Sequence, residues 1–383
     1  MKFNQRILSV FILICFAIMS LGTPAYASVE TIESMTTDLQ NFYAHKKELD
    51  EWEVFGTRAL GQDLSFKYVP SGNLTSPTDY SRRIIGDISA GICVDDNITT
   101  LVNMQETDGA FRHEADASLN NTIWSVIALE FARNNGEDPI YIKDDAIDYI
   151  VGSQDADGGF DISGWGADVD STAHAMIALS FSDDDMTDAI EKAVTYIENK
   201  RDDPSGLYDN WGPSVESTAA VIEGYIANNI NLIDGTVETL KQYQLTDGSF
   251  YPVWDDGISN QMTSYFVLLA LADLKYDGGK YHNKLNPITA TKEGFKISAK
   301  KINVDEVNID IGVPAELIAG ETKLLAISWE GSNHGYFYQN INIDEDSVFR
   351  FGLNKTGVDE LNIMLWDSLD GMNPVCDKLN IMF

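Results

Sequence analysis

The sequence is poor in cysteine and in basic residues. It holds 3 cysteines in 383 residues, and 26 Lys and Arg stand against 60 Asp and Glu, for a net charge of −34. So few thiols exclude a disulfide framework and a cysteine-rich zinc site. Cys93 and Cys376, the two beyond the N-terminal segment, lie far apart, and the sequence leaves open whether they pair. Nucleic acids and anionic membranes are bound through Lys and Arg, so the acidic balance argues against both partners. It suits a protein outside the cell, although solubility alone is the simpler explanation.

Long apolar runs are also scarce, and the one that stands out is N-terminal. Lys2 and Arg6 precede an apolar stretch over 7–21, and Ala25-Tyr26-Ala27 has the small-x-small pattern of a cleavage site. Residues 1–27 are therefore expected to be a secretory signal peptide. The mature chain would be extracellular, free or associated with the cell envelope. No later stretch is long and apolar enough for a bilayer, so no integral membrane segment is expected after cleavage.

The sequence does contain a repeated motif. A glutamine, a glycine and an aromatic residue recur with constant spacing, at Gln105/Gly109/Phe111, Gln154/Gly158/Phe160 and Gln244/Gly248/Phe250. A degraded copy carries Gly206 and Leu207. Each turn is followed by a polar residue and an apolar run, anchored at Thr122, Thr172, Thr218 and Thr263. Two sets of anchors that keep one period indicate a repeat architecture.

Each repeat predicts an amphipathic outer helix, a turn, a loop and an inner helix. The inner helices are expected over 121–132, 171–181, 217–227 and 261–273, with two earlier ones over 51–60 and 79–92. Outer helices are expected at places such as 144–151 and 188–198. The inner segments are apolar almost all round, which is typical of helices buried on every side. Six inner helices within an outer layer predict a mainly α fold, an (α/α) toroid of about five to six hairpins over 28–285.

The pattern changes in the C-terminal part. A linker is expected over about 277–293, with Gly278, Gly279 and Pro287, and after it segments such as Val307–Ile311 alternate apolar and polar residues. About seven short strands in roughly 95 residues predict a small Ig-like β-sandwich over 286–383.

The repeat resembles the one shared by squalene and hopene cyclases and the β-subunits of protein prenyltransferases. The resemblance covers 29 to about 285 and rests on the three Gln-x-x-x-Gly-x-aromatic copies, in which Phe stands where Trp is usual. It implies the same toroid, which non-catalytic relatives also use, among them cobalamin carriers and complement-like thioester domains. The C-terminal part looks like a β module appended to secreted bacterial proteins.

The resemblance also points to a candidate catalytic acid. Cyclases of this superfamily protonate an alkene or epoxide with an Asp-x-Asp-Asp motif, and the matching stretch is Asp168-Val169-Asp170-Ser171. It implies Asp170 as general acid, supported by Asp168 and by His174 one helical turn later. Ser171 replaces the third acid, which changes how strongly the carboxyl can be tuned. No zinc ligand is implied, because no Cys occurs in the repeats after Cys93.

A structural explanation competes with each candidate. The counterparts of Asp170 in other copies are taken as Asn120, Glu216 and Gln261, and a polar residue in every copy favours helix capping over catalysis. His174 permits an ion pair, an acid/base pair or half a metal site, but is more simply a core histidine.

Two further features carry candidate ligands. Asp155, Asp157 and Asp161 alternate as in a calcium loop, although Gly166 stands where an EF-hand has its bidentate Glu, so turn formation is the simpler reading. Tryptophans precede three inner helices, at Trp165, Trp211 and Trp254. If the ring closes, they would gather at one mouth with Glu216, to bind a ligand or to plug the barrel.

The sequence thus predicts a secreted or cell-surface protein that uses the toroid as a non-catalytic scaffold. Its partner would be a small molecule, a glycan or a cell-envelope component. A protonation-initiated terpene cyclase is the alternative, and whether the protein is an enzyme stays open.

Overall fold

A computed structural model describes most of the chain after residue 28. The described ranges are 29–92, 94–113, 118–209, 211–255, 257–276, 278–285, 289–292, 295–301, 306–312, 321–331, 334–343, 347–352, 358–366 and 379–382. The expected signal peptide, Cys93, Cys376 and the expected domain start at 286 lie outside these residues. Within them, no helix combines the length and the hydrophobicity that crossing a bilayer requires.

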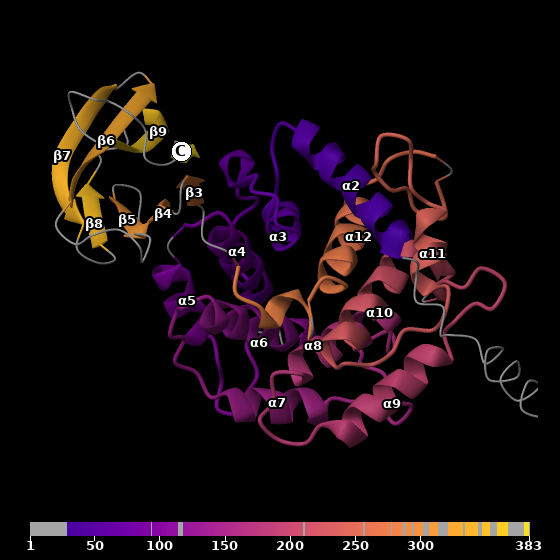
Figure 1. Cartoon of the computed structure of the whole chain (residues 1–383). Coiled ribbons are helices and arrows are strands. Elements are labelled where there is room, and N and C mark those ends of the chain that lie inside the picture. The colour runs from indigo at the N-terminus through magenta and orange to yellow at the C-terminus, as the bar shows by residue number, and fades with distance from the viewer. Residues whose placement is uncertain are drawn as a thin grey trace, which may run out of the picture.

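Six helices form a closed inner ring (Figure 1). They are α3 (Glu51–Ala59), α4 (Pro77–Ser89), α6 (Leu119–Asn134), α8 (Val169–Leu179), α10 (Val215–Ala227) and α12 (Gln261–Asp273). Each contacts the next, and α12 contacts α3 to close the ring. The prediction of six inner helices is confirmed.

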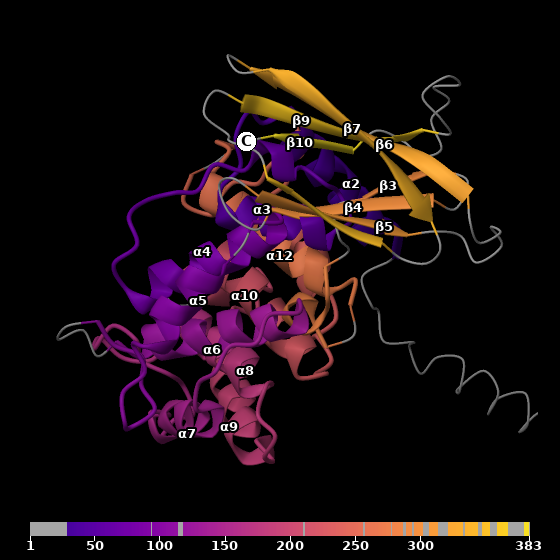
Figure 2. The ribbon, with the colours of Figure 1, turned by 90° about the vertical axis from the view of Figure 1, so that its left-hand side faces the viewer.

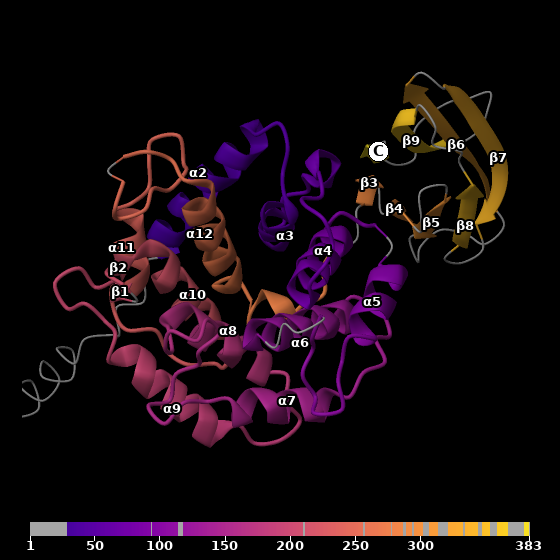
Figure 3. The same cartoon turned by 180° about the vertical axis from the view of Figure 1, so that it is seen from behind.

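Five helices lie outside this ring and complete an (α/α) toroid, which Figure 3 shows from behind. They are α2 (Val29–His45), α5 (Asp95–Val102), α7 (Lys143–Gly152), α9 (Thr187–Glu198) and α11 (Thr236–Lys241). Burial follows the two layers. Every residue of α6 over 121–132 is buried, whereas α9 buries only Ala189, Ala193, Tyr196 and Ile197. The apolar periodicity of the sequence therefore separated the layers correctly.

The repeated glutamine and glycine join neighbouring repeats. Gln154 Nε2 donates to the carbonyls of Gly158 and Ala189, each at 2.9 Å, and so ties its turn to α9. Gly158 has φ +95°, and a Cβ there would lie 2.3 Å from the Lys192 carbonyl. Only glycine fits such a position, because both the backbone conformation and the close approach exclude a side chain.

The last copy of the motif closes the ring. Gln244 Nε2 donates to the carbonyl of Met35 in α2 at 3.2 Å, and a Cβ on Gly248 would lie 2.1 Å from the carbonyl of Asp38. The same device that joins consecutive repeats therefore joins the end of the toroid to its beginning.

Two repeat anchors differ by one residue from the sequence prediction. The aromatic backbone N–H of each turn donates to a hydroxyl on the following inner helix, as Phe160 does to Thr172 Oγ1 at 3.0 Å. In the degraded copy Tyr208 makes this bond to Thr218, so Leu207 was the wrong anchor. In the last copy Phe250 bonds Ser264 Oγ, so Thr263 was also wrong. Tyr208 stands two residues after Gly206, as Phe160 stands two residues after Gly158, so alignment by glycine identifies it.

The chain after α12 crosses the inside of the ring, as the orange segment in Figure 1 shows. Within this segment, defined as the strap (279–285), η2 (Lys280–His282) contacts α6 and α10. The ring of Tyr281 packs 5.1 Å from Phe55 and 6.4 Å from Phe131. The strap thus fills the end of the ring at which the inner helices finish.

The C-terminal strands form two antiparallel four-stranded sheets that lie one over the other (Figure 2). One sheet has the order β10 (Leu379–Met382), β9 (Val358–Trp366), β6 (Glu321–Gly331), β7 (Gly335–Ile343). The other has the order β3 (Thr289–Lys292), β4 (Phe295–Lys301), β5 (Glu306–Gly312), β8 (Ser347–Gly352). The described residues of this part form eight strands where about seven were expected, and the β-sandwich is confirmed. A short hairpin, β1 (Tyr208–Asp209) and β2 (Pro213–Ser214), precedes α10 in the toroid.

Candidate functional site

A cavity of about 450 Å³ lies inside the ring at the end where the inner helices begin, which we call the mouth. Its walls are largely aromatic, with a few polar groups among them. The lining residues are Trp52, Asn120, Trp124, Ile162, Asp168, Asp170, Ser171, His174, Trp211, Glu223, Tyr265, Phe266 and Leu269.

Asp168, not Asp170, is the cap of α8. The Asp168 carboxylate accepts from the backbone N–H and from the hydroxyl of Ser171, each at 2.7 Å. Ser214 and Asn260 cap α10 and α12 in the same way. The expectation that Asp170 caps the helix was therefore wrong, because the N-cap position lies two residues earlier. The counterpart of Asp170 in the last copy is Met262, not Gln261, so a polar residue does not recur at this position.

Asp170 lies in the first turn of α8 and faces the cavity. Its Oδ1 is buried and has no hydrogen-bond partner. The pKa of Asp170 is raised to about 6, mainly by burial; the hydrogen bond with Ser217 opposes this rise, and the charges of Asp168 and Glu216 add to it. At neutral pH this carboxyl is mostly ionised, but it loses its charge just below. It is the only carboxyl among the described lining residues with a fully unpartnered buried oxygen.

Glu216, the acid of the next copy, is occupied. It is buried and accepts from Ser214 Oγ at 2.9 Å and from Thr263 Oγ1 on α12. It is not among the residues that line the cavity. Glu216 therefore links α10 to α12, and its negative charge helps to raise the pKa of Asp170.

His174 lines the cavity as a neutral ring. Burial, together with the charge of Lys280, lowers its pKa to about 3. Its ring lies 4.8 Å from Trp124 and 6.4 Å from Phe266. An ion pair with Asp170 is excluded at neutral pH, because the imidazole carries no charge there. The ring packs against aromatic side chains on α6 and α12.

The three loop tryptophans differ in their positions. Trp165, Trp211 and Trp254 are 84%, 84% and 74% exposed, and of the three only Trp211 lines the cavity. The aromatic wall is formed instead by Trp52 and Trp124, whose ring centroids lie 4.9 Å apart. The sequence analysis did not identify these two as site residues.

Counting residues from the N-cap of each inner helix would have identified the aromatic residues of the cavity wall. Residues two and six positions after the capping residue face the cavity on several inner helices. The second position holds Trp52, Asn120 and Asp170, and the sixth holds Trp124, His174 and Phe266. The signal was present in the sequence but required the correct cap.

A buried ion cluster lies beneath the cavity. Lys280 Nζ donates to Glu223 Oε2 at 2.5 Å and to Asp273 Oδ2 at 2.7 Å, and all three side chains are almost fully buried. Burial raises the pKa of both carboxyls, and the Lys280 ammonium opposes this. Glu223 also lines the cavity, so the cluster joins the strap to the floor of the site.

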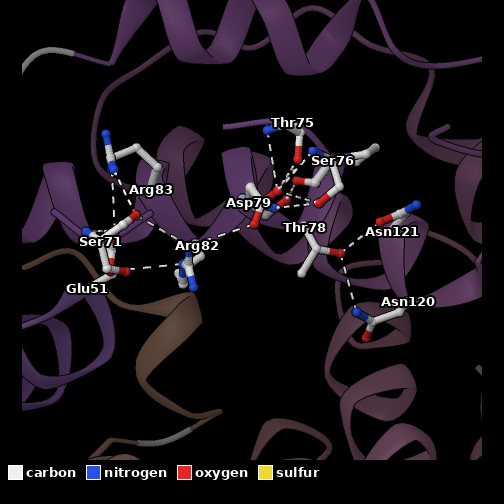
Figure 4. Close-up of polar contacts among 12 residues, drawn as sticks. Glu51, Ser71, Thr75, Ser76, Thr78, Asp79, Arg82, Arg83, Asn120 and Asn121 are labelled. Atoms are coloured by element: carbon white, nitrogen blue, oxygen red, sulfur yellow. Dashed lines mark hydrogen bonds and ion pairs between the residues drawn. The ribbon is translucent and has the colours of Figure 1, made fainter. Parts of the chain in front are cut away.

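Polar contacts fix the side of the mouth near α4 (Figure 4). Glu51 accepts from the backbone N–H and hydroxyl of Ser71, at 2.9 and 2.6 Å, and from Arg83 Nε at 3.3 Å. Thr78 Oγ1 accepts from Asn120 Nδ2 at 3.3 Å, which orients the amide at the edge of the cavity. The loop before α4 is thereby held beside the start of α3.

The candidate calcium loop is organised by hydrogen bonds of its own. Asp161 accepts from the backbone N–H groups of Ser163, Gly164 and Gly166, at 2.7–2.9 Å, and these bonds hold its pKa low. Asp157 accepts from the Gly159 N–H. Among the described residues, no group of three or more His, Cys, Asp or Glu is arranged to hold a metal ion. Calcium at Asp155, Asp157 and Asp161 stays a prediction.

The comparisons with known proteins give structural likenesses only. No family model matches the sequence, and no curated protein does. An ent-copalyl diphosphate synthase from Streptomyces platensis is 17% identical with a TM-score of 0.41, over 62% of this chain and 50% of that one. This chain therefore spans half of the synthase.

Two further solved structures are similar at the same level. A type II terpene cyclase from Scytonema, in complex with merosterolic acid A, is 15% identical with a TM-score of 0.40, over 62% of this chain and 86% of that one. A Candida albicans protein geranylgeranyltransferase-I complexed with GGPP is 12% identical with a TM-score of 0.40, over 69% and 90%. The (α/α) toroid itself is established here by the contacts among the helices of this chain.

Proposed function

We propose that the toroid binds a small molecule in its cavity without changing it chemically. The observation that carries the proposal is the unpartnered Oδ1 of Asp170, buried in an aromatic-lined cavity. A buried polar atom without a partner costs free energy, roughly 1–3 kcal/mol. Such a cost is explained when a ligand supplies the missing partner.

The size and lining of the cavity support this proposal. Ligand sites are typically concave, about 300–1,000 Å³, and apolar with a few polar groups that fix orientation. The cavity has about 450 Å³, with Trp52, Trp124 and Phe266 as apolar surface and Asp170 as a polar anchor. A ligand with a compact apolar body and one polar group would fit this arrangement.

The chemistry of Asp170 favours binding over catalysis. Protonating an alkene needs a strong acid, and a carboxyl whose pKa is raised to about 6 is a weaker proton donor than an ordinary one. When ionised, Asp170 accepts a hydrogen bond from Ser217. Among the described residues, it forms no ion pair with a cation. Ser171 stands where a further acid would tune it.

We also propose that the protein acts outside the cell. The N-terminal pattern of residues 1–27 and the acidic composition support export. A toroid followed by a β module suits a protein that holds a ligand at, or beyond, a cell surface. A cell-envelope component or a glycan fragment would then be within reach.

A terpene-cyclase-like activity is the second candidate. It is favoured by one observation, that Asp168, Asp170 and Ser171 of the matching motif all line one aromatic cavity. In that case Asp170 would protonate an isoprenoid, with the aromatic wall facing the developing positive charge.

Native mass spectrometry of the protein purified from its own secretion medium, beside Asp170→Asn, tests both candidates. An unmodified small molecule carried by the wild type, and depleted in the folded variant, is the expected result. A cyclised isoprenoid that disappears in Asp170→Asn would instead establish the enzyme. Protein that stays empty when offered lipid, glycan and amine mixtures would contradict the binding proposal.

A further inference from the structure

We propose that the ligand of this cavity is an organic cation, an amine or a quaternary ammonium compound, held against aromatic faces and paired with the Asp170 carboxylate. This inference rests on the proposed binding function and names the chemical class of its ligand.

The aromatic wall has the composition that binds organic cations. Trp52 and Trp124 lie 4.9 Å apart at an interplanar angle of 54°, so their faces are neither parallel nor stacked flat. Trp211, Tyr265 and Phe266 complete the lining. Trp gives the strongest cation–π attraction, and several tilted rings around one space can each offer a face to an ammonium group.

The charges around the cavity have one sign. Asp168, Asp170 and Glu223 line it, and none of the described lining residues is Lys or Arg. Lys280, beneath the cavity, is fully buried and bonded to both Glu223 and Asp273. His174 is neutral at physiological pH. A cation in the cavity therefore meets carboxylates and π faces.

The inner helices begin at this mouth, and their N-termini carry partial positive charge of roughly half a unit each. At the two helices nearest Asp170, other groups already balance this positive charge. Asp168 accepts two hydrogen bonds at the start of α8, and Ser214 caps α10 with Glu216 in its first turn. The Asp170 carboxylate is an additional charge that the helix does not need for capping.

The charge state of Asp170 couples binding to pH. The groups that face it are Asp168 on its own helix and Glu216 and Ser217 on α10, and the two carboxylates make its ionisation harder. A bound cation opposes them and favours the ionised form. Cation binding therefore releases a proton, and affinity rises from pH 5 to pH 7.

Choline and its uncharged carbon isostere, 3,3-dimethylbutan-1-ol, test the proposal on the full chain. The two have the same shape and differ in charge, so the difference between them isolates the cation. Calorimetry and tryptophan fluorescence at pH 7 measure the two dissociation constants. Choline is expected to bind at least tenfold more tightly, and its affinity is expected to fall about tenfold by pH 5.

Two variants and one control complete the test. Asp170→Asn removes the charge with little change of shape and should abolish most of the preference for choline. Trp211→Leu alters an exposed part of the lining, so it should fold normally and weaken choline binding severalfold. Asp144→Asn removes an equal charge from the first turn of the outer helix α7 and should leave both constants unchanged.

The outcomes separate this inference from the proposed function. Equal or tighter binding of the uncharged isostere would overturn the cation proposal and leave a binding cavity. Binding of farnesol but of neither small probe would do the same and favour an isoprenoid ligand. A cavity that takes up none of the three probes would overturn both proposals.

Discussion

At the scale of single residues, Asp168 and Asp170 at the start of α8 have opposite effects on stability. Asp168 satisfies backbone donors, whereas Asp170 is buried with an unpartnered oxygen. Residues that cost stability in a cavity are frequently those that serve function. The two aspartates could not be told apart from sequence, because both precede the same apolar run and only the capping geometry separates them.

The stability effect of Asp170→Asn should depend on pH. Asp170 has a folded pKa of about 6 against an ordinary value of 3.8, so its ionisation opposes folding above pH 6. We expect the variant to be more stable than the wild type by about 1–3 kcal/mol at pH 8. The gain should shrink as pH falls through 6 and vanish near pH 4. Urea unfolding at four pH values measures it, and a gain independent of pH would contradict the assigned ionisation.

The neighbouring aspartate should behave in the opposite way. Asp168→Ala removes a cap with two hydrogen bonds and should cost about 1 kcal/mol at pH 7. Asp168→Asn retains an acceptor at the cap and should cost less. Thermal unfolding of the two variants compares them, and an equal loss in both would mean that charge rather than capping stabilises this helix start.

At the scale of helices and turns, most of the architecture could be predicted from sequence. The inner helices were identified because an all-round apolar pattern has no other stable location. The register was wrong at Leu207 and Thr263, because the copies were not aligned on the helix caps; Tyr208 and Ser264 make the repeat hydrogen bonds, and Ser264 stands four residues after the cap Asn260. Trp52 and Trp124 were missed for the same reason, since their positions follow from the caps.

The repeat glycine should be far less replaceable than a glycine in an open loop. In Gly158→Ala the new Cβ would meet the Lys192 carbonyl at 2.3 Å, in addition to the strain of φ +95°. We expect a loss of roughly 3 kcal/mol or more. Gly164→Ala is the matched control, because its φ is +76° and no atom lies within 4 Å, so only about 1 kcal/mol of strain applies. Equal denaturation midpoints would show that the close approach is relieved by movement of α9.

At the scale of the whole molecule, the strap completes the toroid. Its contacts join residues far apart in sequence, as between Asn134 and Tyr281 and between Leu285 and Asn135. Sequence reasoning placed 277–293 in a linker, because glycines and a proline predict an irregular segment and do not reveal what it crosses. The strap shows that part of this segment fills one end of the ring and forms the floor beneath the cavity.

The ion cluster of the strap gives a prediction for the entire fold. Lys280→Met would leave Glu223 and Asp273 buried without their cation, and breaking a buried pair in this way costs about 3–5 kcal/mol. The two carboxyls would then hold protons in the folded state, so the variant should gain stability relative to the wild type as pH falls from 8 to 5. Urea unfolding over that range measures both effects.

A triple variant, Lys280→Met with Glu223→Gln and Asp273→Asn, separates the charge from the packing of the strap. It removes all three charges and should recover most of the lost free energy, because neutral groups carry a smaller desolvation penalty. Its stability should also lose the dependence on pH that the single variant shows. If the triple variant were as unstable as the single one, the cluster would act by specific hydrogen bonding of the strap to α10 and α12. In that case the floor of the cavity would depend on geometry that no neutral substitute supplies, and ligand binding should fall together with stability in both variants.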